Sequence, residues 1–141
     1  MIAYFDSSAF VKLLIPEQGS DEARRLYAAA TQVFSSRLLV PEASAALARA
    51  RRMGRLTARA SDSALAASRA LLEGVSPLEV IPAVADAAAR LAEAYALRAY
   101  DAVHLASYRR MESATSVLVA ADGDLVHAAK TVGHAVAVPG A

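Results

Sequence analysis

Apolar runs and alanine-rich stretches alternate along the chain, and their two periodicities predict two kinds of element. A run of four or five apolar residues bounded by polar or turn residues is typical of a strand buried in a parallel sheet. Stretches that repeat apolar residues every three or four positions are typical of amphipathic helices. On this basis we predict five strands, over residues 2–5, 32–35, 78–81, 117–120 and 135–138.

Proline, glycine and capping residues set the ends of the predicted helices. Pro41 suits the first turn of a helix because its missing N–H would have no partner there, and Gly54 ends that helix. Thr57 is a good N-cap for the next helix, which ends at Gly74. The predicted helices cover residues 8–14, a segment that begins at 20, and residues 41–54, 57–74, 83–97, 100–111 and 125–131.

Strands that alternate with helices pair in parallel through right-handed crossovers. The sequence therefore predicts an α/β fold, namely a doubly wound parallel sheet flanked by helices on both faces. In such sheets ligands bind beyond the carboxyl ends of the strands, where the winding reverses. The residues that follow each strand are therefore the first candidates for chemistry.

The composition narrows the class of protein. The 141 residues, 56% of them hydrophobic, predict a single folded domain over 1–141. There is no cysteine, which excludes disulfides, zinc–thiolate sites and cysteine nucleophiles. A formal net charge of +1 gives no global attraction for nucleic acid, so such binding would need a local basic patch. We find neither a membrane-spanning apolar run nor a signal peptide, so we expect a cytoplasmic protein.

Four carboxylates stand where predicted strands end or predicted helices begin. Asp6 follows the first strand and Asp122 follows the fourth, while Glu42 and Asp101 lie at helix starts. If the first and fourth strands are adjacent, all four side chains face one end of the sheet. Carboxylates that close repel one another unless some are protonated or a cation joins them. Their hard oxygens favour Mg²⁺ or Mn²⁺, which can polarise a phosphodiester and activate water for in-line attack.

The same acidic residues also have plain structural interpretations. The helix dipole alone favours acidic residues near helix N-termini, which would account for Glu42 and Asp101. Asp124 is either a further metal ligand or the N-cap of the short helix that begins at Leu125, and we favour the cap. The joint placement of the four carboxylates is what favours a site.

Four segments carry a resemblance to a known family. The sequence FDSSAFVKL at 5–13 resembles the opening of the PIN-domain ribonucleases, especially the VapC toxins of toxin–antitoxin pairs. DAVHLA at 101–106 is similar to the main internal motif of that family, and DGDL at 122–125 is similar to its last acidic motif. PEASAALAR at 41–49 resembles its glutamate helix. The resemblance spans nearly the whole chain in the family's order and spacing.

This resemblance implies the strand order 3-2-1-4-5 and an endoribonuclease that depends on Mg²⁺ or Mn²⁺ and cleaves transfer, ribosomal or messenger RNA. It also implies that Asp6, Asp101 and Asp122 bind the metal. Glu42 would complete the catalytic quartet. Ser8, or alternatively its neighbour Ser7, would order Asp6 or a metal-bound water. The other interpretation of Ser8 is that it caps the following helix.

Partners follow from the resemblance as well. It implies a cognate antitoxin that points a basic side chain into the acidic pocket, and we also expect a homodimer. Apolar helix faces around Leu26, Leu38, Leu39 and Leu47 would supply the surface for such partners. The alternative is a compact monomer in which these leucines all belong to the core.

Two basic residues and one histidine lie close to the acidic positions in sequence. Arg49 follows Glu42 by seven positions on the same helix face, so it could hold an RNA phosphate beside the carboxylates. Lys12 is a second candidate for RNA contact, with a solvated lysine as the alternative. His104, three positions after Asp101, could act as ligand or base, but its apolar neighbours favour a packed, hydrogen-bonded histidine.

Other functions fit the sequence less well. A PIN-like module that binds RNA or protein without cutting would tolerate the loss of an acidic residue, whereas all four are present. A phosphoacceptor receiver domain needs an early pair of adjacent acidic residues and a lysine after its last strand. Here Asp6 is followed by two serines, and no lysine follows Lys130. Dinucleotide-binding and P-loop enzymes are excluded because the chain has no glycine fingerprint.

Overall fold

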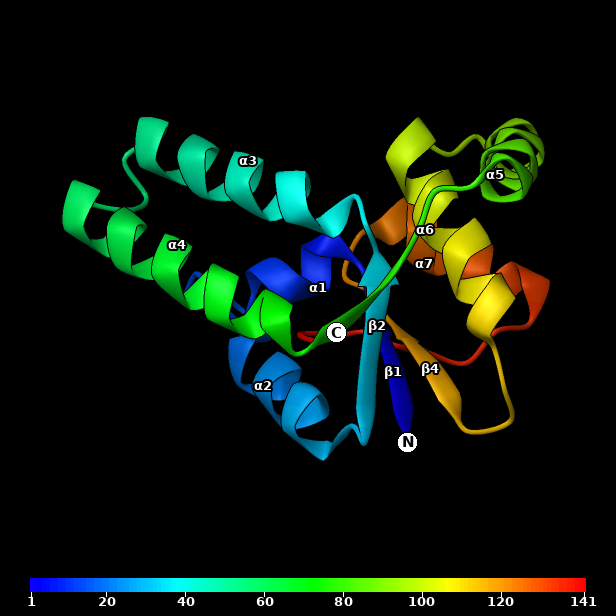
Figure 1. Ribbon diagram of the computed structural model, residues 1–141, viewed down its shortest axis with the longest axis horizontal. Helices are drawn as coiled ribbons and strands as arrows, with labels where there is room; N and C mark the ends of the chain where they lie inside the picture. Colours follow the sequence, from blue (N-terminus) through cyan, green and yellow to red (C-terminus); the bar gives the residue numbers. More distant parts are fainter.

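The computed structural model describes residues 1–141 as five strands and seven helices built around one parallel sheet (Figure 1). None of the helices is long and apolar enough to cross a membrane. The elements in chain order are β1 (Ile2–Phe5), α1 (Ser7–Val11), α2 (Ser20–Ala29), β2 (Gln32–Ser36), α3 (Leu39–Arg52), α4 (Ala58–Glu73), β3 (Val75–Leu78), α5 (Pro82–Tyr95), α6 (Ala99–Met111), β4 (Ser116–Val119), α7 (Gly123–Val132) and β5 (Val136–Ala137).

The strand order is β3-β2-β1-β4-β5, and every neighbouring pair is parallel. This confirms the doubly wound α/β fold and the predicted order. The central strand β1 pairs with β2 on one side and β4 on the other, so that Ile2 lies opposite both Gln32 and Ser116. The chain leaves β1 at Asp6 and leaves β4 after Val119, and both exits therefore lie at the same edge of the sheet.

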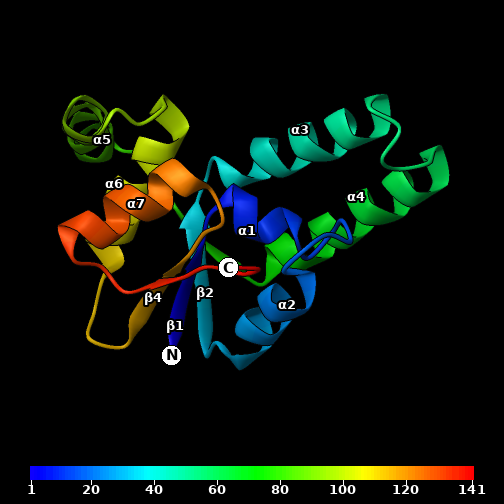
Figure 2. The same ribbon diagram turned by 180° about the vertical axis from the view of Figure 1, so that it is seen from behind.

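Helices cover both faces of the sheet, as the two opposite views show (Figures 1 and 2). Helices α1 to α4 lie on one side, and α3 and α4 run side by side away from the sheet. Helices α5, α6 and α7 lie on the other side. Successive β1 side chains enter opposite cores, with Phe5 on the α1–α4 side and Tyr4 on the α5–α7 side.

Helix α6 differs from the other helices because much of it is buried, polar side chains included. Asp101, His104 and Ser107 are all buried along with their apolar neighbours. Burying a polar group costs free energy unless hydrogen bonds replace those with water. We therefore expect the buried polar side chains of α6 to have partners within the protein, and these partners identify the candidate site.

The third strand lies three residues earlier than predicted, at Val75–Leu78 instead of 78–81. Residues 78–81 were predicted as a strand because they are mostly apolar and precede Pro82, but Val80 and Ile81 are exposed. Pro77 is tolerated inside the strand because β3 is an edge strand with one partner, so its missing N–H breaks no ladder bond. Pro82 begins α5 instead of closing a strand.

The prediction of uncovered leucine faces is wrong for its main members. Leu39 and Leu47 are buried in the core on the α1–α4 side, where they join Phe10, and Leu26 packs against the same core. Leu38 is partly buried and lines a pocket beside α1. Packing of α3 against α1 and α4 buries leucines that the composition alone left without a partner.

Candidate acidic site at the carboxyl edge of the sheet

Asp6 ends β1 and also begins α1, so its carboxylate is fixed by the turn between them. It is the N-cap of α1 and accepts a hydrogen bond from the backbone N–H of Ala9 at 2.9 Å. Ser8 Oγ lies 2.8 and 2.7 Å from the two carboxylate oxygens and donates its hydrogen to them. Only 1% of Asp6 is exposed. The structure therefore holds this carboxylate in one orientation at the centre of the edge.

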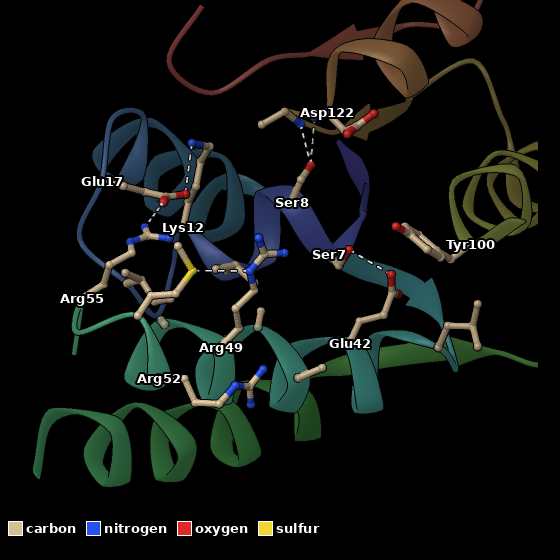
Figure 3. Close-up of a pocket in the computed structure, with 18 residues that line it drawn as sticks. Ser7, Ser8, Lys12, Glu17, Glu42, Arg49, Arg52, Arg55, Tyr100 and Asp122 are labelled. Carbon is tan, nitrogen blue, oxygen red and sulfur yellow. Dashed lines mark hydrogen bonds and ion pairs between the residues drawn. The ribbon is translucent and has the colours of Figure 1, made fainter. Parts of the chain in front are cut away.

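Ser8 connects the ends of the two central strands. Besides donating to Asp6, its Oγ accepts hydrogen bonds from the backbone N–H groups of Ala121 at 2.8 Å and Asp122 at 3.1 Å (Figure 3). The cap of α1 is Asp6, so the interpretation of Ser8 as that cap is wrong. Its hydroxyl instead ties the turn after β4 to the turn after β1.

Glu42 lies in the first turn of α3 and reaches the same edge from the β2 side. Its Oε2 accepts a hydrogen bond from Ser7 Oγ at 3.0 Å, and its Oε1 lies 2.6 Å from Nε2 of His104. His104 has no exposed surface, whereas 18% of the Glu42 side chain is exposed. Both oxygens of Glu42 therefore have a partner supplied by the protein.

Asp101 and Asp122 are joined by a residue that the sequence analysis did not single out. The guanidinium of Arg98 places Nε 3.1 Å from Asp101 Oδ2 and Nη2 2.9 Å from Asp122 Oδ2. The Asp101 side chain is 6% exposed, but the Arg98 side chain is 57% exposed. One solvent-exposed cation thus bridges two of the four predicted site carboxylates.

Burial raises the pKa of two of the site carboxylates, Asp6 and Asp101. Desolvation raises the pKa of Asp6 to about 6, against the opposing effects of His104 and of the Ala9 and Ser8 hydrogen bonds. The pKa of Asp101 is raised by desolvation and then by the charge of Asp122, partly opposed by Arg98. Burial alone would lower the pKa of His104, but Glu42 and the two aspartates raise it. The edge carries more negative charge than the protein itself neutralises.

The donor set fits a hard divalent cation. Carboxylate oxygens are the ligands that Mg²⁺ and Mn²⁺ prefer, and a bound cation would favour the ionised form that burial disfavours in Asp6 and Asp101. In the present arrangement no three acidic or histidine side chains converge as ligands, and Arg98 occupies the space between Asp101 and Asp122. Metal binding therefore requires Arg98 to leave at least one of these carboxylates.

A pocket of about 960 Å³ opens from the acidic edge between α1 and α3 (Figure 3). Glu42, Asp122 and Tyr100 line its acidic end. The rest of the lining is largely apolar, with four basic side chains among the apolar ones: Lys12, Arg49, Arg52 and Arg55. The side chain of Arg49 points into this pocket, and its Nε contacts only Met53 Sδ at 3.5 Å. A groove with carboxylates at one end and several basic side chains further along suits a phosphodiester chain.

The other candidate residues are placed less favourably. Lys12 lines the same pocket, but its Nζ already binds Glu17 at 3.2 Å and the carbonyl oxygen of Gln18 at 2.7 Å. Asp124 is exposed and makes no hydrogen bond. The N-cap of α7 is Asp122, which accepts from Leu125 N at 3.1 Å, so the preferred interpretation of Asp124 as the cap is wrong.

The fold and the site together define the class: a doubly wound α/β protein with an acidic site where its sheet reverses winding. Residues 3–131 match the PIN domain family. Ribonuclease VapC45 of Mycobacterium tuberculosis (strain CDC 1551 / Oshkosh) is 44% identical over 106 residues, which are 75% of this chain and 74% of that protein. Ribonuclease VapC46 of M. tuberculosis H37Rv is 38% identical over 136 residues, 96% of each. The chain therefore belongs to the PIN-domain family and, within it, to the VapC group.

Solved structures have the same fold. A toxin–antitoxin complex from Klebsiella pneumoniae contains a chain that superposes with a TM-score of 0.67 and 18% identity, over 97% of both chains. The protein PAE2754 from Pyrobaculum aerophilum superposes with a TM-score of 0.63 and 24% identity, over 91% of this chain and 87% of that one. The predicted family and fold are thus both confirmed.

Proposed function

We propose that this protein is a metal-dependent endoribonuclease and the toxin of a toxin–antitoxin pair. The observation that carries the proposal is the gathering of Asp6, Glu42, Asp101 and Asp122 around the carboxyl edge of a PIN sheet. These four side chains come from segments far apart in sequence, and a purely structural role would not need buried carboxylates at one place. Membership in the VapC group supports RNA as the substrate.

Asp6, Asp101 and Asp122 are the residues that would hold Mg²⁺ or Mn²⁺. Such an ion, when bound, polarises a phosphodiester and lowers the pKa of water enough to provide the nucleophile. Ser8 keeps Asp6 oriented toward the edge through its hydrogen bond. Glu42 opens onto the pocket, where its carboxylate would orient the attacking water and accept its proton.

The RNA would lie in the pocket between α1 and α3. Arg49 has no carboxylate partner, so its guanidinium is free to bind a phosphate next to the acidic end. Lys12 stays a weaker candidate, because a phosphate would have to compete with Glu17. Tyr100 is 44% exposed at the mouth of the pocket and provides a ring against which a base can stack.

The partners follow from the same assignment. A cognate antitoxin would neutralise the carboxylates with a basic side chain, as Arg98 does within the chain. We also propose a homodimer, supported by exposed apolar residues near the carboxyl edge, namely Val40, Val80 and Ile81. Residues 1–141 would form one PIN domain, and a ribonuclease that acts on cellular RNA would work in the cytoplasm.

End-group analysis tests the nuclease proposal directly. The purified protein should cleave RNA with Mg²⁺ or Mn²⁺ and lose activity with a chelator. The products should carry a 5′-phosphate and a 3′-hydroxyl, because water attacks the phosphorus and the ribose 2′-hydroxyl takes no part. A 2′,3′-cyclic phosphate would contradict the mechanism. Binding of RNA without cleavage in any divalent metal would favour the alternative of a non-catalytic PIN module.

Co-expression tests the assignment as a toxin. The protein should slow bacterial growth when expressed alone, and a small DNA-binding protein encoded next to it should restore growth and copurify. Light scattering at micromolar concentration measures the dimer. A monomeric nuclease that its neighbour neither binds nor inhibits would remove the toxin assignment while leaving the nuclease assignment standing.

A further inference from the structure

A chain of buried hydrogen bonds runs from the sheet to the acidic site through His104. Tyr4 Oη on β1 lies 2.8 Å from Nδ1 of His104, and the other ring nitrogen, Nε2, lies 2.6 Å from Glu42 Oε1. Neither Tyr4 nor His104 has any exposed surface. The chain thus links residues of β1, α6 and α3 that are far apart in sequence.

The hydrogen-bond partners of His104 determine its tautomer, and they place a hydrogen on the ring nitrogen that faces Glu42. The backbone N–H of Ser36 donates to Tyr4 Oη at 3.0 Å, and the Tyr4 hydroxyl can then donate its own hydrogen to Nδ1 of a neutral His104. Nε2 of that tautomer carries the hydrogen and donates it to Glu42. A protonated His104 also carries a hydrogen on Nε2, so the bond to Glu42 is the same in both states.

Packing alone does not account for this chain. Tyr108 is a second fully buried tyrosine in the same core, and its ring also meets Tyr4 edge to face. Its hydroxyl reaches only Ser116, at 3.3 and 3.4 Å. The core therefore accommodates a tyrosine that touches no site residue, whereas the Tyr4–His104 pair leads directly to a site carboxylate.

We propose that His104, supported by Tyr4, is a positioning residue that holds the Glu42 carboxylate in its working orientation; this rests on the proposed nuclease function. His104 binds Oε1 and Ser7 binds Oε2, so the Glu42 side chain cannot rotate freely although it is partly exposed. His104 has no surface from which to touch RNA, which excludes the direct catalytic role considered from the sequence. It acts through Glu42.

Two amide substitutions of His104 distinguish the contribution of Nε2 from that of Nδ1. The amide nitrogen of His104→Gln can take the place of Nε2 and still donate to Glu42, whereas the shorter amide of His104→Asn can reach only the position of Nδ1. Both variants remove the ring, so both lose similar packing. Positioning through Glu42 predicts a loss of roughly 10- to 100-fold in single-turnover cleavage for His104→Asn, and a distinctly smaller loss for His104→Gln. Equal rates for the two variants, corrected for thermal stability, would overturn the proposal.

Tyrosine variants give a matched pair in the same core. Tyr4→Phe removes the hydroxyl that supports His104 and should reduce cleavage by about fivefold. Tyr108→Phe removes a hydroxyl from an equally buried ring and should change the rate less than twofold. Urea unfolding of both variants measures the structural cost separately. Tyr4→Phe activity as high as that of Tyr108→Phe would count against the support role of Tyr4.

An NMR measurement tests the contact without any catalysis. The side-chain ¹⁵N shifts of His104, identified by their absence in His104→Gln, should show Nε2 protonated and its proton protected from exchange with water. Glu42→Ala should remove that protection while leaving the signals of His127 and His134 unchanged. An unprotonated Nε2 would overturn the positioning role. A wild-type protein with protected Nε2 but no cleavage in any metal would refute the nuclease assignment and keep the contact.

Discussion

The four site carboxylates form two pairs that the protein holds in opposite ways. Asp6 and Glu42, the donor-held pair, are fixed by hydrogen-bond donors anchored in the fold: Ser8 and the Ala9 N–H on one, Ser7 and His104 on the other. Asp101 and Asp122, the arginine-held pair, are bridged by the Arg98 guanidinium. The first pair is anchored to buried backbone and core side chains, and the second depends on a solvated cation.

The two pairs therefore differ in whether the partner of the carboxylates is a fixed part of the fold or a cation that another cation can replace. Hydroxyl and backbone N–H donors orient a carboxylate and leave most of its negative charge, so Asp6 in particular still attracts a cation or a proton. Arg98 cancels charge at the arginine-held pair and must leave before another cation enters. We infer that the donor-held pair sets the geometry and that the arginine-held pair regulates access.

The largest expected effect comes from removing a charge of the arginine-held pair. Asp101→Asn keeps the shape of the side chain but removes an expected metal ligand, so cleavage should fall by roughly a thousandfold. Circular dichroism should show an intact fold. The matched control is Asp62→Asn on the exposed side of α4, which should cleave like the parent. An Asp101→Asn protein with parental activity would remove this pair from the site.

The buried Asp6 carboxylate, which only neutral donors bind directly, should lower the stability of the metal-free protein when it is ionised. Its pKa of about 6 lies above the ordinary 3.8, so the folded state binds the proton more tightly than the unfolded state does. The ionised side chain therefore destabilises the metal-free protein above pH 6, and the penalty vanishes below about pH 4. Asp6→Asn should raise the free energy of unfolding by about 2 kcal/mol at pH 8 in chelator. A shift of two pKa units corresponds to a slightly larger free energy than this.

Urea unfolding at pH 4, 6 and 8 measures this difference between variant and parent. The gain should be largest at pH 8, nearly as large at pH 6 and small at pH 4. A gain that is constant across this range would show that ionisation of Asp6 is not its source. A loss of stability at every pH would mean that the Ser8 and Ala9 hydrogen bonds outweigh desolvation.

Arg98 offers the sharpest test of the contrast between the pairs. Arg98→Ala removes the competing cation, so Mn²⁺ should bind about tenfold more tightly by calorimetry. In chelator the same variant should be less stable than the parent, because Asp101 and Asp122 then repel each other without a bridge. Arg37→Ala, which removes an exposed arginine paired with Glu79, is the control and should leave Mn²⁺ binding unchanged. Weaker Mn²⁺ binding in Arg98→Ala would mean that Arg98 supports the metal site.

The smallest expected effect lies outside both pairs, at Arg49. Arg49→Ala should raise KM for RNA about threefold with little change in kcat, and should reduce the salt dependence of binding by about one phosphate contact. Arg110→Ala, at the exposed far end of α6, should change neither quantity. A fall in kcat with unchanged KM would place Arg49 in the chemistry instead of in substrate binding.

The sequence predicts those parts of the molecule that depend on local pattern. β1, β2 and β4 were predicted within one residue at each end. β1 and β4 are dominated by apolar residues, whereas β2 has only Val33 and Phe34 between polar ones. The error at β3 arose because an edge strand needs only one partner and tolerates Pro77, so its apolar pattern is weak. The N-cap of α7 was predicted at Asp124 and is Asp122, whose side chain accepts a hydrogen bond from the N–H three residues on, that of Leu125.

The contacts that hold the carboxylates were less accessible from the sequence. Arg98 precedes Asp101 by three positions, a spacing that allows an ion pair on one helix face, so this half of the bridge could have been found. The Tyr4–His104 bond joins residues 100 positions apart, and no local pattern indicates it. Such pairings depend on the side-chain packing between β1 and α6, which the periodicity of the chain does not encode.

The pairing of β1 with β4 also determines when the site can appear during folding. Asp6 meets the turn at Asp122 only after β4 has been inserted beside β1, with the rest of the doubly wound chain between them. Contacts this distant in sequence form late, since the entropy of closing the long loop must be overcome first. A partly folded chain therefore lacks the acidic site, and cleavage of RNA would begin only when the central strand pair is complete.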